Sequence, residues 1–310
     1  MRTRIFSWMT MVLTAVLMVS CAEDPAPAPV VEIFFEADAT DQYTINFTTV
    51  SENATSFAWD FGDMEVGTGA AVSHTYATSG DYTVTVTATG EGGDAVSSKS
   101  VTIAADMAEL ISGGSTATEG KTWKLSRTAT PGVDGAGSVR DDFVADLMPG
   151  TDDQLDLLGL GAEYDNLFTF YHDGSYSINN VDGNNLAGWI YAALNVPQED
   201  WVIMTDIGLF SVKSTPPATP TWGLTEDTDL VIEAVDEVEG GPHVEKTVTF
   251  ADADYITFGG GGFLASQDLN VYAIVREVSS TRMVATIFMH SVMDVATKPS
   301  HMLSLSFDAQ

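Results

Sequence analysis

Four aromatic residues in the C-terminal half of the chain have the side chains and the setting to bind a ligand. Each lies in a stretch without regular strand alternation, and they are Trp189, Tyr191, Trp201 and Trp222. Aromatic rings stack on the apolar faces of sugar rings, while neighbouring amides hydrogen-bond the hydroxyls. The nearby amides are Asn179, Asn180, Asn184 and Asn185. The alternative is that these aromatic residues belong to the core, but we expect at least one to bind a glycan without covalent chemistry.

Motifs of common enzyme classes are missing from the sequence. It has no Gly-x-Ser-x-Gly, no His-Glu-x-x-His and no complete phosphate-binding Gly-x-x-x-x-Gly-Lys-Ser/Thr motif. His290 and His301 lack metal-ligand spacing, and the glycine run 259–262 favours a bulge or tight bend. The carboxylates in 233–239 do not have the spacing of a sandwich glycosidase and are typical of a solvated strand end. We therefore expect no enzyme activity, with a glycoside hydrolase or lyase kept as an alternative.

The chain is strongly acidic. It has 310 residues, with 44 Asp and Glu against 12 Lys and Arg, for a formal net charge of −32. Such a surface repels nucleic acid and anionic polysaccharide, so a neutral polysaccharide is the expected partner. The acidity could simply keep an extracellular protein soluble. Calcium is the one cofactor it suggests, because hard cations take carboxylate oxygens; the candidate sites are the loop Asp134–Asp142 and the cluster Asp152, Asp153 and Asp156.

The N-terminal segment 1–21 has the features of an export signal. Arg2 and Arg4 precede an apolar run, 5–19, that is too short for a comfortable membrane span. The run ends in Leu-Met-Val-Ser-Cys, which resembles a lipobox, although methionine stands where leucine is usual. Cys21 is the only cysteine in the chain. We expect it to be lipidated; an ordinary secretory signal with a chance cysteine is the alternative.

Residues 22–30 continue with an acidic and proline-rich spacer. Ala22-Glu23-Asp24 resembles the signal that directs lipoproteins of Bacteroidota to the outer face of the outer membrane. Alternating Pro and Ala at 25–29 predict a stiff, extended segment. The expected location is the extracellular face of the outer membrane, with a lipid anchor.

Residues 31–104 carry the most specific motif. Phe57-Ala-Trp-Asp-Phe-Gly-Asp63, His74-Thr-Tyr76 and the alternating run 80–87 together resemble a polycystic-kidney-disease (PKD) domain. This resemblance implies an immunoglobulin-like β-sandwich that acts as a spacer or an accessory binding module. The residues agree, because Trp59 and Phe61 would share a buried face and 82–88 alternate with period two. Asp60 and Asp63 are expected to bond local backbone N–H groups at the turn.

After a join at 105–117, residues 118–310 predict a larger all-β domain, a sandwich of jelly-roll type. Strands are expected near 167–171, 175–179, 230–234, 247–250, 255–258, 271–275, 283–289 and 302–307. For the first two we predict a three-residue loop with Gly174 in the left-handed conformation. Phe170 would then pair with Tyr176, and Phe168 with Ile178, so that all four share the buried face. A two-residue Asp-Gly turn would pair aromatic residues with polar ones.

Short aromatic segments of this second domain carry another resemblance. Thr122-Trp-Lys-Leu125, Tyr164–Phe170, Asp173-Gly-Ser-Tyr176 and Phe263-Leu264 are similar to the domain that follows PKD domains in Bacteroidota surface glycan-binding lipoproteins. Those proteins serve polysaccharide-utilisation systems, which implies a cell-surface protein that binds a glycan and feeds an uptake transporter. An adhesion or scaffold lipoprotein is the remaining alternative.

Overall fold

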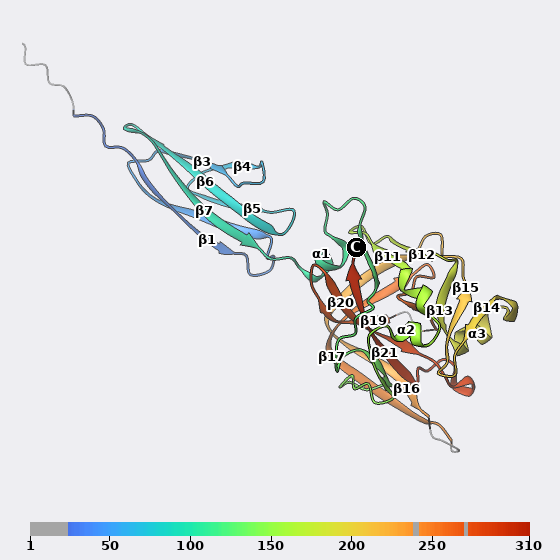
Figure 1. Ribbon diagram of the computed structural model, residues 1–310. Helices are drawn as coiled ribbons and strands as arrows, with labels where there is room; N and C mark the ends of the chain where they lie inside the picture. The colour runs from blue at the N-terminus through green and yellow to red at the C-terminus, as the bar shows by residue number, and fades with distance from the viewer. Residues whose placement is uncertain (1–23, 238–241, 270–271) are drawn as a thin grey trace, which may run out of the picture. The chain divides into compact units, whose positions relative to one another are not determined.

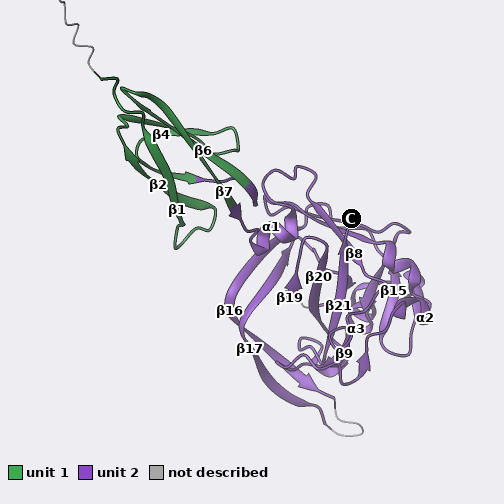
Figure 2. Cartoon of the chain, turned by 60° about the vertical axis from the view of Figure 1, so that its left-hand side comes forward, with its two compact units in different colours: residues 1–74, 82–101 green, residues 75–81, 102–310 purple. Residues whose placement is uncertain are grey.

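The computed structural model describes residues 24–237, 242–269 and 272–310 (Figure 1). The predicted leader and Cys21 lie outside the described residues. Contacts divide the chain into two units, one of residues 1–74 and 82–101 and the other of residues 75–81 and 102–310 (Figure 2). Both are built mainly from strands, so the expected all-β fold, a small N-terminal sandwich followed by a larger one, is confirmed.

The N-terminal sandwich has two antiparallel sheets. One has the order β1-β2-β5, formed by Val30–Ala37, Thr44–Glu52 and Ala71–Thr75. The other has the order β4-β3-β6-β7, formed by Val66–Thr68, Ser56–Asp60, Gly80–Gly90 and Gly93–Ile103. On β6 the expected alternation is present, since Val84, Val86 and Ala88 are buried while their neighbours are not.

Trp59 and Phe61 fill the core of this sandwich, as predicted. Their rings stack with centroids 6.3 Å apart, and Phe47 packs against both. The Trp59 indole N–H donates to the Gly69 carbonyl at 2.9 Å, so its polar atom is satisfied inside the domain. Trp59 is therefore a core residue and not a ligand platform.

The turn that follows β3 shows the predicted carboxylate contacts. Asp60 accepts from the Gly62 N–H at 2.9 Å, and Asp63 accepts from the Glu65 N–H at 3.0 Å. Met64 stands where the PKD pattern usually has glycine, and its φ of 76° is in the left-handed region. Its side chain is 98% exposed, which avoids packing conflicts at a backbone position that favours glycine.

The C-terminal unit contains a ten-stranded sheet. Its main order is β12-β11-β8-β21-β20-β19-β17-β16, and β9 joins it by pairing with β21 and β10. In chain order, the strands are β8 (Lys121–Leu125), β9 (Gly135–Ser138), β10 (Met148–Pro149), β11 (Leu167–Phe170), β12 (Tyr176–Asn179), β16 (Thr221–Asp236), β17 (Val244–Gly259), β19 (Tyr272–Val278), β20 (Arg282–Met289) and β21 (His301–Ala309). β17 is one long strand across the two segments predicted at 247–250 and 255–258.

A second, four-stranded sheet has the order β14-β15-β13-β18. Its strands are Trp201–Met204, Leu209–Lys213, Asn184–Gly188 and Ser266–Gln267. The helices of this unit are short: α1 (Met107–Ser112), α2 (Gln154–Leu157) and α3 (Trp189–Asn195), with 3₁₀ turns at Gly161–Asp165, Gln198–Asp200 and Met293–Val295. α3 contacts both β13 and β15. Among the described residues, no helix is long and apolar enough to span a membrane.

The segment predicted as a flexible join instead contains α1. Asp106 caps this helix by accepting from the Glu109 N–H, and Ile111 is fully buried. The indole N–H of Trp123 donates to the Ile111 carbonyl at 2.8 Å. This part of the join is therefore built into the core of the C-terminal unit.

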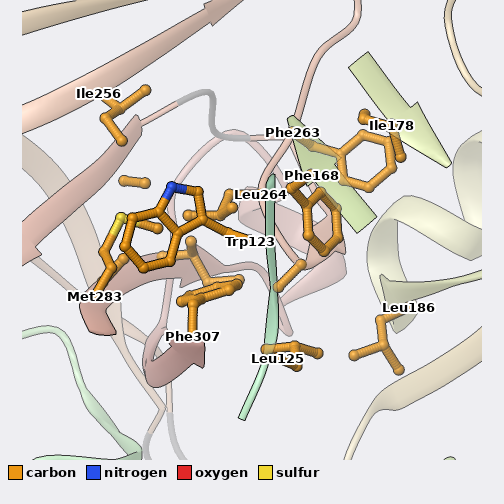
Figure 3. Close-up of a cluster of buried hydrophobic side chains, with 14 of the residues drawn as sticks. Trp123, Leu125, Phe168, Ile178, Leu186, Ile256, Phe263, Leu264, Met283 and Phe307 are labelled. Carbon is orange, nitrogen blue, oxygen red and sulfur yellow. The ribbon is translucent and has the colours of Figure 1, made fainter. Parts of the chain in front are cut away.

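Trp123 lies in the main core of that unit. Figure 3 shows its indole beside Met283 and Leu264, with Phe168 turned towards Phe263. Phe168 also packs edge to face on Phe307, with ring centroids 6.4 Å apart. The side chains come from β8, β11, β20, β21 and the segment before β18, so this core connects the strands of the large sheet.

The predicted β11–β12 hairpin is confirmed in register. Phe168 pairs with Ile178 and Phe170 with Tyr176, and all four side chains are buried. Gly174 closes the loop with a φ of 83°, and its N–H donates to the Tyr171 carbonyl at 3.1 Å.

Gly174→Ala should lower the free energy of unfolding by about 1–2 kcal/mol, the cost of left-handed backbone for a residue with a Cβ. The added Cβ would lie 3.4 Å from the Trp222 carbonyl oxygen, an ordinary contact, so backbone conformation accounts for the loss. Urea unfolding measures it. Gly223→Ala is the control, because Gly223 lies outside the left-handed region. If Gly174→Ala lowered the free energy of unfolding no more than Gly223→Ala, the left-handed backbone of Gly174 would not be the cause of the loss.

Candidate functional site

Trp189 and Tyr191 lie on a helix and not in a loop. α3 begins at Trp189 because Gly188 takes the extended conformation of an N-cap residue. The Trp189 backbone N–H donates to the Gly208 carbonyl at 2.9 Å, and its indole N–H donates to the Ser291 carbonyl at 3.1 Å. These two bonds hold Trp189 against the segments before β15 and after β20.

Trp201 lies just beyond the other end of α3. Its indole N–H donates to the carbonyl of Val196, the C-cap of the helix, at 3.1 Å, and its ring packs on Phe210 at 5.2 Å. Trp189, Tyr191 and Trp201 are all partly buried, and all pack on one small cluster of Ala187, Ala192, Phe210 and Val212. We call these three residues the aromatic surface; two of them belong to α3, which is labelled in Figure 1, and the third is bonded to the C-cap of that helix.

Trp222 is not part of the aromatic surface, contrary to expectation. It is only 9% exposed and packs edge to face on Phe170, with ring centroids 5.2 Å apart. Its indole N–H donates to the Tyr171 carbonyl at 2.8 Å. The proline-rich segment before it gave the appearance of a loop, but Trp222 already pairs with Phe258 in the sheet. It is a core residue, and the interpretation of Trp222 as a sugar-stacking residue is wrong.

The four asparagines do not assemble into a set of sugar-binding amides. Asn185 is buried and donates to the Leu186 carbonyl, and Asn180 is buried and donates to the Ser214 carbonyl. Asn184 is partly buried and Asn179 is exposed on β12, which lies in the other sheet. Two of the four therefore hold the backbone of the domain.

A buried carboxyl group, Glu163, was not found from the sequence. Asn166 donates to its Oε2 at 2.7 Å and the Ser211 hydroxyl donates to its Oε1. Burial raises the pKa of Glu163, while these two hydrogen bonds oppose the shift. The group links the 3₁₀ turn at Gly161–Asp165 to β15 of the small sheet and so acts in the scaffold behind the aromatic surface.

Glu163→Gln should gain stability relative to the natural chain as pH rises. A carboxyl whose folded pKa is raised stabilises the fold below its unfolded pKa, near 4.5, and that contribution is lost as pH rises through the folded pKa. We therefore expect the Tm difference between variant and natural chain to move in favour of the variant from pH 4.5 to pH 7.5. Thermal unfolding at several pH values checks this, with exposed Glu119→Gln as the control. A difference that is constant with pH would contradict the shift.

Five of the six carboxylates in the two regions expected to bind calcium are engaged by protein groups, and the sixth, Asp141, is exposed. Arg127 pairs with Asp153 at 3.1 Å and with Asp156, and Arg140 pairs with Asp142 at 2.6 Å. The remaining two accept backbone N–H groups: Asp152 from Ala129 and Asp134 from Thr130. Within the described ranges, no group of three or more His, Cys, Asp or Glu side chains is arranged to hold a metal ion.

Chelation should therefore leave Tm unchanged. Calcium stabilises a fold only where it binds the native state, and Arg127 and Arg140 already pair with Asp153, Asp156 and Asp142. Differential scanning fluorimetry in EDTA and in millimolar calcium tests this. A rise in Tm with calcium that Asp153→Asn abolishes would show that the cluster binds the ion after all.

A cavity of about 310 Å³ lies inside the C-terminal unit. Its walls come from β8, β9 and β21 of the large sheet, from β13 and β15 of the small sheet, and from α2. Most of the lining is apolar, and the main apolar side chains are Leu125, Ala136, Leu155, Leu158, Leu186, Leu209, Met289, Leu303 and Leu305. Two further lining residues, Leu147 and Ile207, are 54% and 45% exposed, so the cavity reaches the surface beside them.

His290, Ser291 and His301 also line this cavity. The Nδ1 atom of His290 lies 2.5 Å from Oδ1 of Asp268, and both side chains are only 2% exposed. The pair joins the segment after β18 to the segment after β20. We call His290, Ser291 and His301 the polar end of the cavity; its lining also includes Ser126, Asp134, Thr151, Gln154, Ser304 and Ser306. The sequence offered no local signal for it, because Asp268 and His290 are 22 residues apart.

His301 lies among hydroxyl groups. Its Nδ1 is 3.0 Å from the Ser291 hydroxyl and 2.9 Å from the Ser300 hydroxyl, while Glu237 lies 4.0 Å from the same nitrogen. In a Ser-His-acid triad the hydroxyl and the carboxylate contact opposite ring nitrogens, so this arrangement differs from one. Burial lowers the pKa of His301, although the charges of Glu237 and Asp146 oppose the shift.

The comparisons with known proteins bear on the N-terminal domain. A model of the PKD domain family matches residues 26–105, so the chain contains a PKD domain there. Two solved structures are similar: the PKD1 domain of Vibrio anguillarum Epp and that of the Vibrio cholerae metalloprotease PrtV, each 26% identical. They cover 26% and 25% of this chain and 99% and 98% of their own, with TM-scores of 0.24 and 0.23. No curated protein sequence matches the chain.

A further similarity extends over both domains. A solved structure described as showing the promiscuous specificity of carbohydrate-binding modules from the β-sandwich superfamily covers 91% of this chain and 92% of its own, at 11% identity. Its TM-score is 0.25, which is too low to carry an argument about this chain. What the C-terminal domain does has to be argued from its own residues.

Proposed function

We propose that this PKD-domain-containing chain is a non-catalytic surface lipoprotein whose C-terminal domain binds a neutral polysaccharide at the aromatic surface. The observation that carries the proposal is that Trp189, Tyr191 and Trp201, all only partly buried, pack against the same small cluster beside α3. Each residue is partly exposed to solvent, and both indole N–H groups are bonded to backbone carbonyls. The rings are thus held in place without a ligand, which lowers the entropic cost of stacking on sugar.

The spacing of the two tryptophans suits a chain of sugars. Trp189 is the first residue of α3, the Trp201 indole is bonded to its C-cap Val196, and a seven-residue helix is about 10 Å long. That span exceeds one sugar ring, so the two indoles would contact different residues of a polymer. The net charge of −32 favours a neutral glycan over an anionic one.

The rest of the chain supports a surface role. The proposal includes lipidation at Cys21, an outer-membrane location on the extracellular face, and delivery of the glycan to an uptake transporter. The proline-rich spacer and the PKD domain would then hold the binding domain away from the membrane.

Native gels test this proposal. The chain from residue 22 onward, which keeps every described residue, is run through gels that contain neutral glucans, mannans or xylans. Retardation by one glycan supports binding, and reducing ends released from that glycan would favour the hydrolase or lyase alternative. A chain that no glycan retards, with its fold verified by circular dichroism, would favour an adhesion or scaffold role.

A further inference from the structure

We propose that the cavity is a second ligand site, independent of the aromatic surface, for a small neutral molecule that is largely apolar and carries a hydroxyl group at one end. The site lies wholly within the C-terminal unit, between its two sheets.

The walls suit an apolar occupant. Protein interiors are packed tightly, and an unfilled apolar cavity destabilises the fold. Here about 310 Å³ lies among leucines of both sheets, and pockets for small ligands begin near this size. Because Leu147 and Ile207 at its edge are exposed, a molecule can enter without unfolding the core.

The polar end supplies a hydrogen-bond acceptor. Asp268 contacts Nδ1 of His290, so in the neutral imidazole the proton is on Nδ1 and Nε2 is the acceptor. Among the described residues, no hydrogen bond to Nε2 of His290 is found. His290 is nine-tenths or more buried and lines the cavity, so a ligand hydroxyl can satisfy this atom. Ser291 is also in the lining, and its hydroxyl contacts Glu237, Ser300 and His301.

The charges near the polar end select a neutral ligand. Asp268 contacts His290, and Glu237 contacts Ser291. His301 adds no compensating positive charge at neutral pH, because burial lowers its pKa. Asp134 is a further acid in the lining, and no lysine or arginine is among the lining residues. A carboxylate or phosphate would therefore meet acidic groups without a basic side chain to pair with, whereas a hydroxyl carries no charge.

The test uses the chain from residue 22 onward, washed free of lipid, and the neutral fluorescent probe N-phenyl-1-naphthylamine. The probe should bind saturably, and 1-decanol should displace it at least tenfold better than decanoate at pH 7.5. Absence of saturable probe binding would overturn the proposal, as would equal displacement by alcohol and carboxylate.

Two variants locate the binding. Ala136→Phe places a ring among the lining residues and should abolish probe binding, while the matched change Ala71→Phe on an exposed position of the PKD domain should not. The double variant Asp268→Leu/His290→Leu removes both partners of the buried pair. In the natural chain 1-decanol should also displace the probe better than decane does, and the double variant should keep probe binding but lose this difference. Probe binding by Ala136→Phe at the natural affinity would place the site elsewhere and refute the assignment.

Discussion

Trp222→Ala is expected to lower the free energy of unfolding by about 3–5 kcal/mol, the usual cost of removing a large aromatic side chain from a core. The variant loses the edge-to-face contact with Phe170 and leaves the Tyr171 carbonyl without its indole donor. Trp222 is 9% exposed, so surrounding side chains would have to collapse to fill the space. Chemical denaturation of the chain from residue 22 onward measures the loss.

Trp201→Ala is the matched comparison, because it removes the same side chain from a partly exposed position. Trp201→Ala should lower the free energy of unfolding by about 1 kcal/mol, the typical effect of a single substitution. If Trp222→Ala were the milder of the two, the assignment of Trp222 to the core would be contradicted. If the Trp222→Ala protein folded normally but no longer bound the glycan, Trp222 would have to be assigned to the glycan site.

The second large effect concerns binding. Trp201→Ala should weaken affinity for the retained glycan at least tenfold, which corresponds to about 1.4 kcal/mol. The indole is held by Val196 and Phe210, so its loss removes a preorganised stacking face. Isothermal titration with an oligosaccharide of that glycan gives the two Kd values.

Trp201→Phe serves as the control, since it keeps an aromatic face and should retain part of the affinity. Trp189→Ala should also weaken binding, but it breaks the bond to the Ser291 carbonyl, so its effect combines structure and recognition. If Trp201→Ala bound the glycan with unchanged affinity, Trp201 would not be part of the glycan site.

Local patterns predicted much of the fold. The β11–β12 register followed from the residues alone, because only one loop length places Phe168, Phe170, Tyr176 and Ile178 on the same face. The core of the N-terminal sandwich was likewise predicted from period-two alternation and from Trp59 and Phe61. Both features depend on residues close in sequence, where strand geometry decides which side chains share a face.

The candidate site depended on contacts that a local pattern does not carry. α3 was not predicted, since its seven residues are too few to show helical periodicity. Trp222 looked exposed because prolines precede it, but pairing with β17 buries it. The Asp268–His290 pair and the arginine partners of the acidic loops join segments that are separate in sequence, so their roles emerged only from the fold.

The most direct test of the central claim is a crystal structure of the chain from residue 22 onward with an oligosaccharide of the glycan that retards it. We expect sugar rings stacked on Trp201 and Trp189 at van der Waals distance, along the side of the domain formed by α3. An oligosaccharide bound away from α3, with both indoles free of sugar, would contradict the aromatic surface as the glycan site.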